Sequence, residues 1–301
     1  MFLDSPASAL VYGCAVALLG TGFTLVHVSS DFPHLGLVQH SVLGAYVGYT
    51  LFALMGLSPY LGLPLAFLVG GCVNVAFYLT VVAAMQKRGR SDVMLAISTL
   101  AGSIVMVALV NMYAYWIRET FHTYSMAFVL RDAWALIASF VVLAASVLIL
   151  RRLLSGTRLG VAVRGSAESR ELASVCGVDP FRVQAFSWFV AGGLASTAGL
   201  LFVLQFVGDT SIWMILFTVT FAASFLGGID SALWAPLGVL IVVSTQYAAE
   251  ILLMVIWGEH AQLFSWLIPL LFLSLTLYLE PGGLAAVYDR IRSRHGGTQN
   301  E

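Results

Sequence analysis

The feature that most constrains this chain is a succession of continuous apolar stretches, each about twenty residues long, between residues 8 and 280. Of the 301 residues, 60% are hydrophobic and only 10% are charged. Soluble domains carry about 25% charged residues. A water-soluble fold could not cover its surface with so few charges. The chain is therefore expected to be an integral, multi-pass protein of the cell membrane.

The apolar stretches predict helices. Lipid offers no partners to backbone N–H and C=O groups, so spans must be helices or a closed barrel. Barrel strands alternate in polarity over about ten residues, whereas these stretches are continuously apolar. We predict an all-α polytopic helix bundle of about eight or nine spans, some discontinuous, in one membrane domain (1–301) with a transmembrane core at 8–285. The candidate spans are 8–28, 35–57, 60–85, 93–115, 133–150, 184–206, 211–228, 232–256 and 264–280.

The placement of the cations predicts the orientation of the chain. Of the fourteen Lys and Arg residues, all but Arg118 and Arg131 fall in three clusters. The clusters are Lys87, Arg88 and Arg90; Arg151, Arg152, Arg158, Arg164, Arg170 and Arg182; and Arg290, Arg292 and Arg294. Cytoplasmic loops are rich in Lys and Arg. Nine crossings with the N-terminus outside put all three clusters, and the tail at 286–301, in the cytoplasm.

One span is expected to be interrupted. Residues 29–45 contain a set of polar and helix-breaking residues that an uninterrupted lipid-facing helix would not carry. They are Asp31, Pro33, His34, Gly36, Gln39 and His40. Irregular backbone at membrane depth is tolerated only where protein or a water-filled cavity surrounds it. The segment is therefore predicted to be broken or re-entrant.

The only long polar segment, 151–184, is predicted to contain a short helix. Ser169 is a suitable N-cap, Glu171 lies in the first turn, and Gly177 occupies the position after the last helical residue. A second short helical stretch is expected at 157–164. Two interpretations stand beside each other: a basic segment lying on anionic lipid headgroups, or a docking element for a cytoplasmic protein.

This segment resembles the permease subunits of branched-chain amino acid ABC importers, in which the pattern T-R-x-G-x-A-x-R-A-x-x-x-N-x-E-A-A-x-x-x-G-I forms a coupling helix that sits in a groove of the ATPase. Ser169 stands where Asn is usual, and Leu172 and Ser174 depart mildly from the pattern. The residues in register are Thr157, Arg158, Gly160, Ala162, Arg164, Glu171, Ala173, Gly177 and Val178.

Three further stretches are similar to the same family, and together they cover residues 9–285 in the family's order. Residues 33–46 resemble N-F-A-H-G-x-x-x-x-L-G-A-Y, with L-G-A-Y kept but His34, Gly36, Leu37 and Val38 in place of Asn, Ala, His and Gly. Residues 226–238 resemble L-G-G-x-G-S-x-x-G-x-x-L-G, and 280–284 stand where the family has R-P-x-G-L.

The resemblance implies a permease subunit that forms half of a pathway for branched-chain or related amino acids. It implies a second permease subunit, two cytoplasmic ATPases that use ATP and Mg²⁺, an external solute-binding protein, and no cofactor on this chain. The residues it assigns to ATPase coupling are Arg164, Glu168, Ser169, Glu171, Leu172 and Gly177. Those assigned to the translocation pathway are His34, Gln39, Ser41, Gly227, Gly228 and Asp230.

The sequence also limits the alternatives. It has no P-loop, no H-E-x-x-H, no Cys/His set with metal-ligand spacing and no G-x-S-x-G, so no catalytic role, metal site or nucleic-acid partner is expected. An ion-coupled secondary transporter using Glu250 or Asp31 remains an alternative, because intramembrane carboxylates bind coupling ions. Permeases for urea, short amides or sugars also remain alternatives, since the signature at 33–39 is altered.

Overall fold

The computed structural model of the chain describes residues 5–121, 134–229, 234–258, 267–279 and 282–296. Within these ranges the elements are helical and no β-strand occurs, which confirms the predicted all-α class. Seven helical runs are long and apolar enough to cross a membrane. Two further elements, α2 (His40–Tyr49) and α10 (Ile212–Gly227), are shorter. The count of eight or nine crossings stays a prediction.

Two helices form the centre of the bundle. α1 (Pro6–Ser30) and α9 (Pro180–Val203) pack against each other, and most residues of both are buried inside the protein. Ser5 caps α1, because its Oγ accepts a hydrogen bond from the Ser8 backbone N–H at 3.1 Å. Asp179 caps α9 in the same way, through the Phe181 N–H at 3.0 Å. The centre of the bundle is therefore formed by two helices that lipid scarcely reaches.

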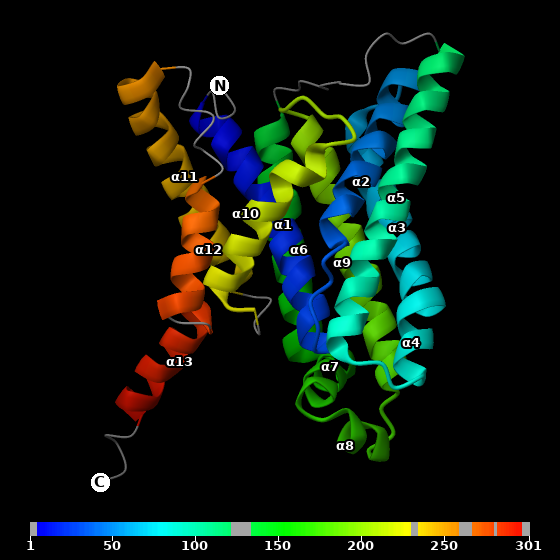
Figure 1. Cartoon of the computed structure of the whole chain (residues 1–301), viewed down its shortest axis with the longest axis vertical. Helices are drawn as coiled ribbons and strands as arrows, with labels where there is room; N and C mark the ends of the chain where they lie inside the picture. Colours follow the sequence, from blue (N-terminus) through cyan, green and yellow to red (C-terminus); the bar gives the residue numbers. More distant parts are fainter. Residues whose placement is uncertain (1–4, 122–133, 230–233, 259–266, 280–281, 297–301) are drawn as a thin grey trace.

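Helices on either side of this centre complete the main body (Figure 1). A continuous run descends through η3 (Pro59–Leu61), α3 (Gly62–Phe77), the π-helical turn η4 (Tyr78–Val82) and α4 (Ala83–Lys87). α3 packs closely on α9, and α6 (Ala135–Gly156) packs on α1. α6 continues past residue 150, where the sequence predicts its end, so Arg151 and Arg152 extend the helix beyond the apolar span.

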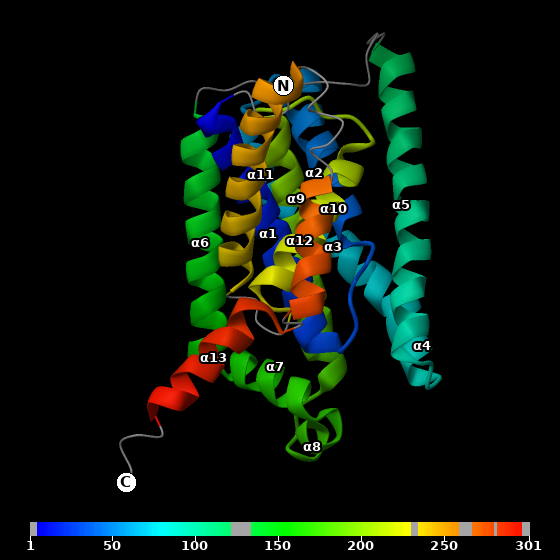
Figure 2. The same cartoon turned by 60° about the vertical axis from the view of Figure 1, so that its left-hand side comes forward.

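α5 (Asp92–Phe121) stands apart from the main body (Figure 2). An apolar groove of about 450 Å³ separates it from α2 and α3, and Leu43, Val47, Leu65 and Leu109 are among its walls. At one end of the groove the Thr50 Oγ1 and Tyr113 OH lie 2.7 Å apart, within hydrogen-bond distance. Beyond the groove, α5 also packs on the hydrophobic core through buried apolar residues such as Leu95 and Ile117.

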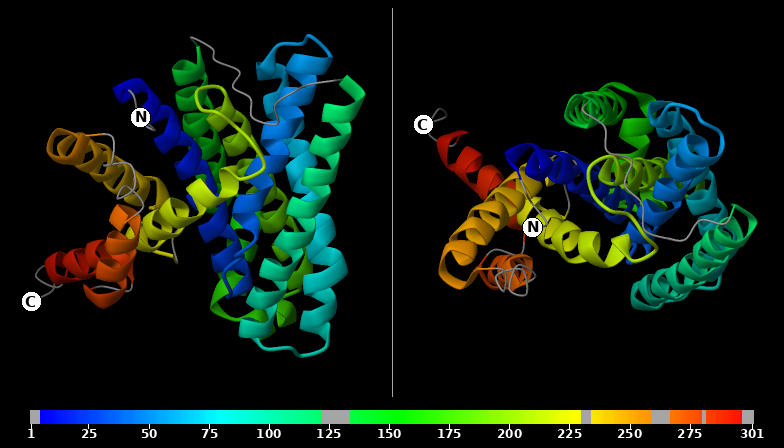
Figure 3. Two further views of the ribbon diagram at one scale, coloured as in Figure 1. Left: turned by 45° about the horizontal axis from the view of Figure 1, so that its top comes forward. Right: turned by 90° about the horizontal axis from the view of Figure 1, so that it is seen from above.

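The last part of the chain leans away from the main body. α11 (Ala235–Trp257), α12 (Leu267–Leu279) and α13 (Gly283–Gly296) are splayed to one side, and α10 lies between them and α2 (Figure 3). α13 follows the predicted span at 264–280 and takes up most of the predicted tail. This arrangement leaves α10 in contact with both the main body and the splayed helices.

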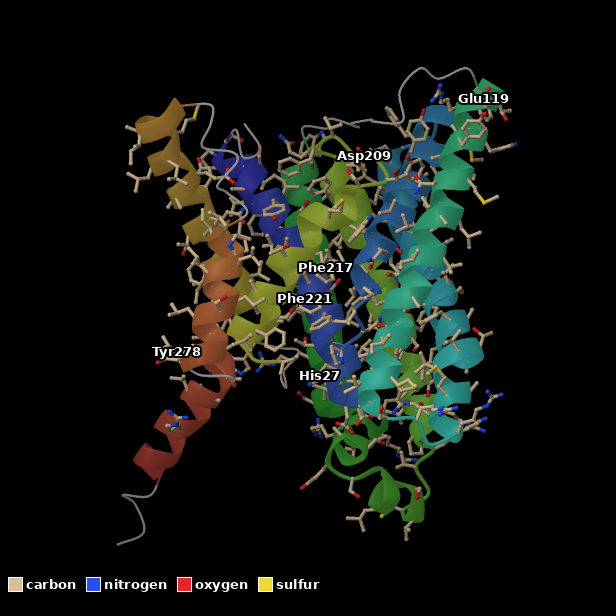
Figure 4. All side chains as sticks on the ribbon, in the orientation of Figure 1. His27, Glu119, Asp209, Phe217, Phe221 and Tyr278 are labelled. Carbon is tan, nitrogen blue, oxygen red and sulfur yellow. The ribbon has the colours of Figure 1, made fainter. Side chains whose placement is uncertain are left out.

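The two ends of the bundle differ in charge. α7 (Arg158–Glu168) and α8 (Arg170–Val175) lie at the end opposite the N-terminus, on the side where the C-terminus also lies (Figure 1). Lys87, at the end of α4, and Arg151, near the end of α6, lie at this same end. Glu119 and Asp209 lie at the other end (Figure 4). By the positive-inside rule the α7–α8 end is predicted to face the cytoplasm.

Candidate functional site

The predicted interruption of the second span is present. α1 ends at Ser30, and Asp31 follows in the left-handed region (φ 60°) with its N–H bonded to the His27 carbonyl at 2.9 Å. Helical structure resumes only at the 3₁₀ turn η1 (Leu37–Gln39), which leads into α2. Asp31 is exposed, whereas the irregular residues 32–36 that follow are buried or half-buried, as their backbone polar groups require. The broken segment is confirmed.

His34 lies in the middle of this interruption and is 1% exposed. Its Nε2 lies 2.9 Å from Asn74 Oδ1 on α3, and the Asn74 Nδ2 donates to the Trp188 carbonyl oxygen on α9 at 2.7 Å. The His34 ring also stacks on the Trp188 indole, with ring centroids 4.3 Å apart. His34 is thus held by two helices distant in sequence.

Further hydrogen bonds tie the irregular segment to its surroundings. The Trp188 Nε1–H donates to Ser30 Oγ at 3.0 Å, and the Leu35 N–H donates to Thr99 Oγ1 on α5 at 3.0 Å. The Ser196 hydroxyl donates to the His40 carbonyl at 2.9 Å, where α2 begins. Each of these bonds compensates a polar group that would otherwise be buried without a partner.

A cavity of about 160 Å³ adjoins the interruption between α2, α3 and α5. His34, His40, Phe77, Thr99, Ser103 and Met106 are among the residues that line it. Gly36 also borders it, and a side chain there would overlap the Thr99 carbonyl and lie 3.0 Å from Ser103 Cβ. Glycine at 36 thus lets the irregular segment approach α5 closely.

The structure separates the predicted pathway residues into two groups. His34, Gln39 and Ser41 are all buried in the interrupted segment, and the Ser41 hydroxyl donates to the Val38 carbonyl at 2.7 Å. Gly227 and Gly228 lie instead where α10 ends, packed near Trp234 and Ala285, and neither lines the cavity. Asp230 lies outside the described residues. A role for any of them in transport stays a prediction.

The predicted coupling element is present as a second candidate site. Ser169 caps α8, accepting a hydrogen bond from the Leu172 N–H at 3.3 Å. The helix ends in a Schellman motif: the Val178 N–H donates to the Ala173 carbonyl and the Gly177 N–H to the Ser174 carbonyl, each at 3.0 Å, with Gly177 at φ 82°. The predicted N-cap and C′ glycine are confirmed.

The preceding helix α7 is longer than the stretch 157–164 that the sequence predicts. Thr157 caps it through the Gly160 N–H at 3.3 Å, and it continues to Glu168. Arg164 hydrogen-bonds the Leu154 carbonyl at the end of α6, which fastens α7 to the bundle. Glu168 is exposed, and Glu171 lies in the first turn of α8 as predicted.

Comparison with known proteins identifies the architecture. The family described as "Branched-chain amino acid transport system / permease component" matches residues 5–276. The chain belongs to this permease family. It is 29% identical over 288 residues to the "Probable branched-chain amino acid transport permease protein LivH" of Methanocaldococcus jannaschii, covering 93% of this chain and 91% of the relative. It is a multi-pass membrane permease.

A second relative and one solved structure are also similar to this chain. The "High-affinity branched-chain amino acid transport system permease protein LivH" of Escherichia coli K12 is 26% identical over 262 residues, which are 80% of this chain and 83% of the relative. The solved structure "PsaBC from Streptococcus pneumoniae in complex with Fab" has a TM-score of 0.50 at 14% identity, covering 93% of this chain and 94% of that one. At this identity it shows a shared fold alone.

Sequence analysis does not find Asn74, Thr99 or Trp188 as parts of the permease's buried site. Asn74 occurs within an apolar span, where an amide most often bonds between helices. Its bond to His34 joins residues 40 positions apart, and its bond to Trp188 joins residues 114 positions apart. A polar residue inside an apolar span is the only sequence signal that such a network leaves.

Trp188 is expected to be the main packing anchor of this permease's interrupted segment. Trp188→Ala should destabilise the bundle by about 3–5 kcal/mol through the cavity it leaves, whereas Trp188→Phe, which loses chiefly the bond to Ser30, should cost about 1 kcal/mol. Thermal unfolding in detergent measures both. Trp116→Ala is the control, because Trp116 on α5 is 53% exposed. Equal losses at 188 and 116 would contradict the anchor role.

Proposed function

We propose that this chain is the permease subunit of an ABC importer and forms half of a pathway for branched-chain or related amino acids. ATP and Mg²⁺ are used by two cytoplasmic ATPase subunits, and a second permease subunit and an external solute-binding protein complete the complex. The family membership and the relatives named as branched-chain amino acid permeases support this proposal.

The observation that carries the proposal is the shape of α8. This six-residue helix has a side-chain cap at its start and a Schellman motif at its end, so it keeps its form with few contacts to the bundle. It projects beyond α7, away from the apolar spans (Figure 2). Leu172 and Val175 are 69% and 85% exposed on it. α8 lies in a polar segment and keeps its shape by itself, so exposed apolar side chains on it indicate a surface that binds a partner protein.

The proposal predicts that an ATPase binds this surface. Val175→Asp should reduce co-purification of the ATPase by at least about tenfold, because it places a charge in an interface that buries apolar area. Val207→Asp is the matched control: Val207 is 59% exposed in the connection between α9 and α10, at the opposite end of the bundle. It should leave retention of the ATPase unchanged.

The same experiment tests the alternative interpretations. Wild-type protein that retains no ATPase under any condition would contradict the importer assignment. Equal retention of the ATPase by Val175→Asp and Val207→Asp would contradict the role of α8. Binding of α8 to anionic vesicles with no effect on the ATPase would favour the lipid-headgroup interpretation.

An ion-coupled carrier is the second candidate function, and Glu250 is the observation that favours it. This carboxyl group is buried in α11, and its Oε1 lies 3.4 Å from the Gln246 amide nitrogen one turn earlier. Buried carboxyl groups at membrane depth bind coupling ions in many carriers. Uptake into vesicles that is driven by an ion gradient without ATP, and lost in Glu250→Gln, would favour the carrier over the importer.

A further inference from the structure

The cavity beside the interrupted segment has an unusual chemical lining. Among the described residues that form it, none is Asp, Glu, Lys or Arg; its polar groups are two imidazoles and two hydroxyls. The Thr99 and Ser103 hydroxyls already donate to carbonyls of their own helix, Ala96 at 2.7 Å and Leu100 at 2.6 Å. The hydrogens of both hydroxyls are therefore engaged, and these two groups offer a ligand acceptor lone pairs only.

The hydrogen bonds around Asn74 decide which nitrogen of His34 carries the proton. Because the Asn74 Nδ2 donates to the Trp188 carbonyl, the side-chain oxygen Oδ1 is the atom that faces His34. An amide oxygen only accepts, so His34 Nε2 is the donor. In a neutral imidazole the other nitrogen, Nδ1, is then an acceptor. Nδ1 is buried and has no hydrogen-bond partner among the described residues.

Packing holds the imidazole in this orientation. One neighbour of the ring is the Trp188 indole, stacked at 4.3 Å, and the Phe77 ring lies nearly parallel at 6.3 Å. The His40 ring meets it edge-on at 6.0 Å and lines the same cavity. A buried acceptor without a partner destabilises the protein, and a ligand that donates a hydrogen bond to it would remove that cost.

We propose that Asn74 is a positioning residue that orients His34, and that His34 Nδ1 accepts a hydrogen bond from an N–H group of a small aliphatic solute in this cavity. The inference rests on the proposed transport function and names the chemistry by which the pathway would recognise its solute. It adds Asn74 and Trp188, which contact no solute, to the residues that determine specificity.

The shape of the site supports an aliphatic body on the solute. The cavity and the apolar groove under α5 share Val73, Met106 and Leu109 in their walls, so the polar end at His34 continues into hydrocarbon surroundings. Cavities of about 150 Å³ hold one benzene molecule, so 160 Å³ accommodates a solute of similar size. The N–H donor can come from two sources: the ammonium group of an aliphatic amino acid, or the amide group of a short carboxamide.

The test is binding of three ligands with nearly the same carbon skeleton to the full-length chain in lipid nanodiscs, followed by saturation-transfer NMR. L-leucine carries an ammonium group, 4-methylpentanamide carries a neutral amide, and 4-methylpentan-2-one has no N–H. We expect at least one N–H ligand to bind about fivefold or more tightly than the ketone, as the loss of one buried hydrogen bond predicts. The one that binds more tightly, L-leucine or 4-methylpentanamide, identifies whether an ammonium or an amide group supplies the N–H donor.

Variants separate a positioning role from general structural damage. The quantity measured in each variant is the affinity for the tighter N–H ligand divided by the affinity for the ketone. His34→Phe and Asn74→Leu should both bring the ratio close to one. A ketone that binds wild type as well as both N–H ligands would overturn the proposal, and so would an unchanged ratio in His34→Phe. Retention of the ATPase by these variants, measured in parallel, would show that the importer assignment stands independently.

Discussion

Gly44→Ala and Gly199→Ala are each expected to prevent assembly of the bundle. A methyl group on Gly44 would overlap the Ser196 carbonyl of α9, and one on Gly199 would overlap the Ser41 carbonyl of α2. Both clashes are with backbone, so the two helices would have to move apart along their contact. Overpacking in a well-packed core costs about 1–3 kcal/mol where side chains can yield, and we expect more here. Size-exclusion chromatography in detergent should show aggregated protein.

Gly13→Ala is the matched control for these two variants. Gly13 lies in the buried helix α1, but a methyl group there would sit 3.6 Å from Val243 Cγ1, an ordinary contact distance. This variant should elute as wild type and unfold within a few degrees of its temperature. If Gly44→Ala were as stable as Gly13→Ala, close backbone contact between α2 and α9 could not be what holds the interrupted segment in place.

These glycines show how far the sequence predicts the fold. Small residues four positions apart, such as Gly44 and Gly48, indicate close helix packing, but they do not name the partner helix. The structure pairs Gly44 with Ser196 and Gly199 with Ser41, a reciprocal contact between α2 and α9. Sequence spacing is local, whereas this pairing depends on how the whole chain is arranged.

The interrupted segment was predictable for the same local reason. Pro33 and Gly36 disfavour a helix, and buried polar residues around them require partners. What the sequence could not supply was the set of partners, because Asn74, Thr99 and Trp188 come from three other helices. The polar residues of the segment indicated that a buried network exists, and only the fold shows that it is built around His34.

The capped helix α8 was the most predictable element. Its signals, Ser169 before the first turn and Gly177 after the last, lie within nine residues and act through their own backbone. Helix α13 was not predicted, although Ala and Arg favour helices, because a basic stretch after the last span is equally compatible with an extended tail. The sequence could not predict that α5 stands apart from the main body, since its apolar residues face both the lipid and the groove.

Gly177→Pro is expected to have the largest effect on coupling. Gly177 has φ 82°, and its N–H donates to the Ser174 carbonyl at 3.0 Å. Proline requires φ near −65° and has no N–H, so it removes this bond and cannot adopt the turn. The end of α8 would then be misplaced, while the apolar spans would be unaffected. Retention of the ATPase by the purified permease should fall by at least about tenfold, with unchanged membrane insertion and unfolding temperature.

Gly89→Pro separates this effect from general damage to the α7–α8 end of the bundle. Gly89, in the turn between α4 and α5, has φ 66°, and its N–H donates to the Gln86 carbonyl at 2.9 Å. Neither glycine has a neighbouring atom within 4 Å of an added Cβ, so both substitutions damage only a turn. If Gly89→Pro lowered ATPase retention as strongly as Gly177→Pro, the α7–α8 segment would not be the coupling element. If only Gly177→Pro did so, retention of the ATPase would depend on the form of a helix of six residues, as expected where a force from the ATPase must reach the bundle through a rigid contact.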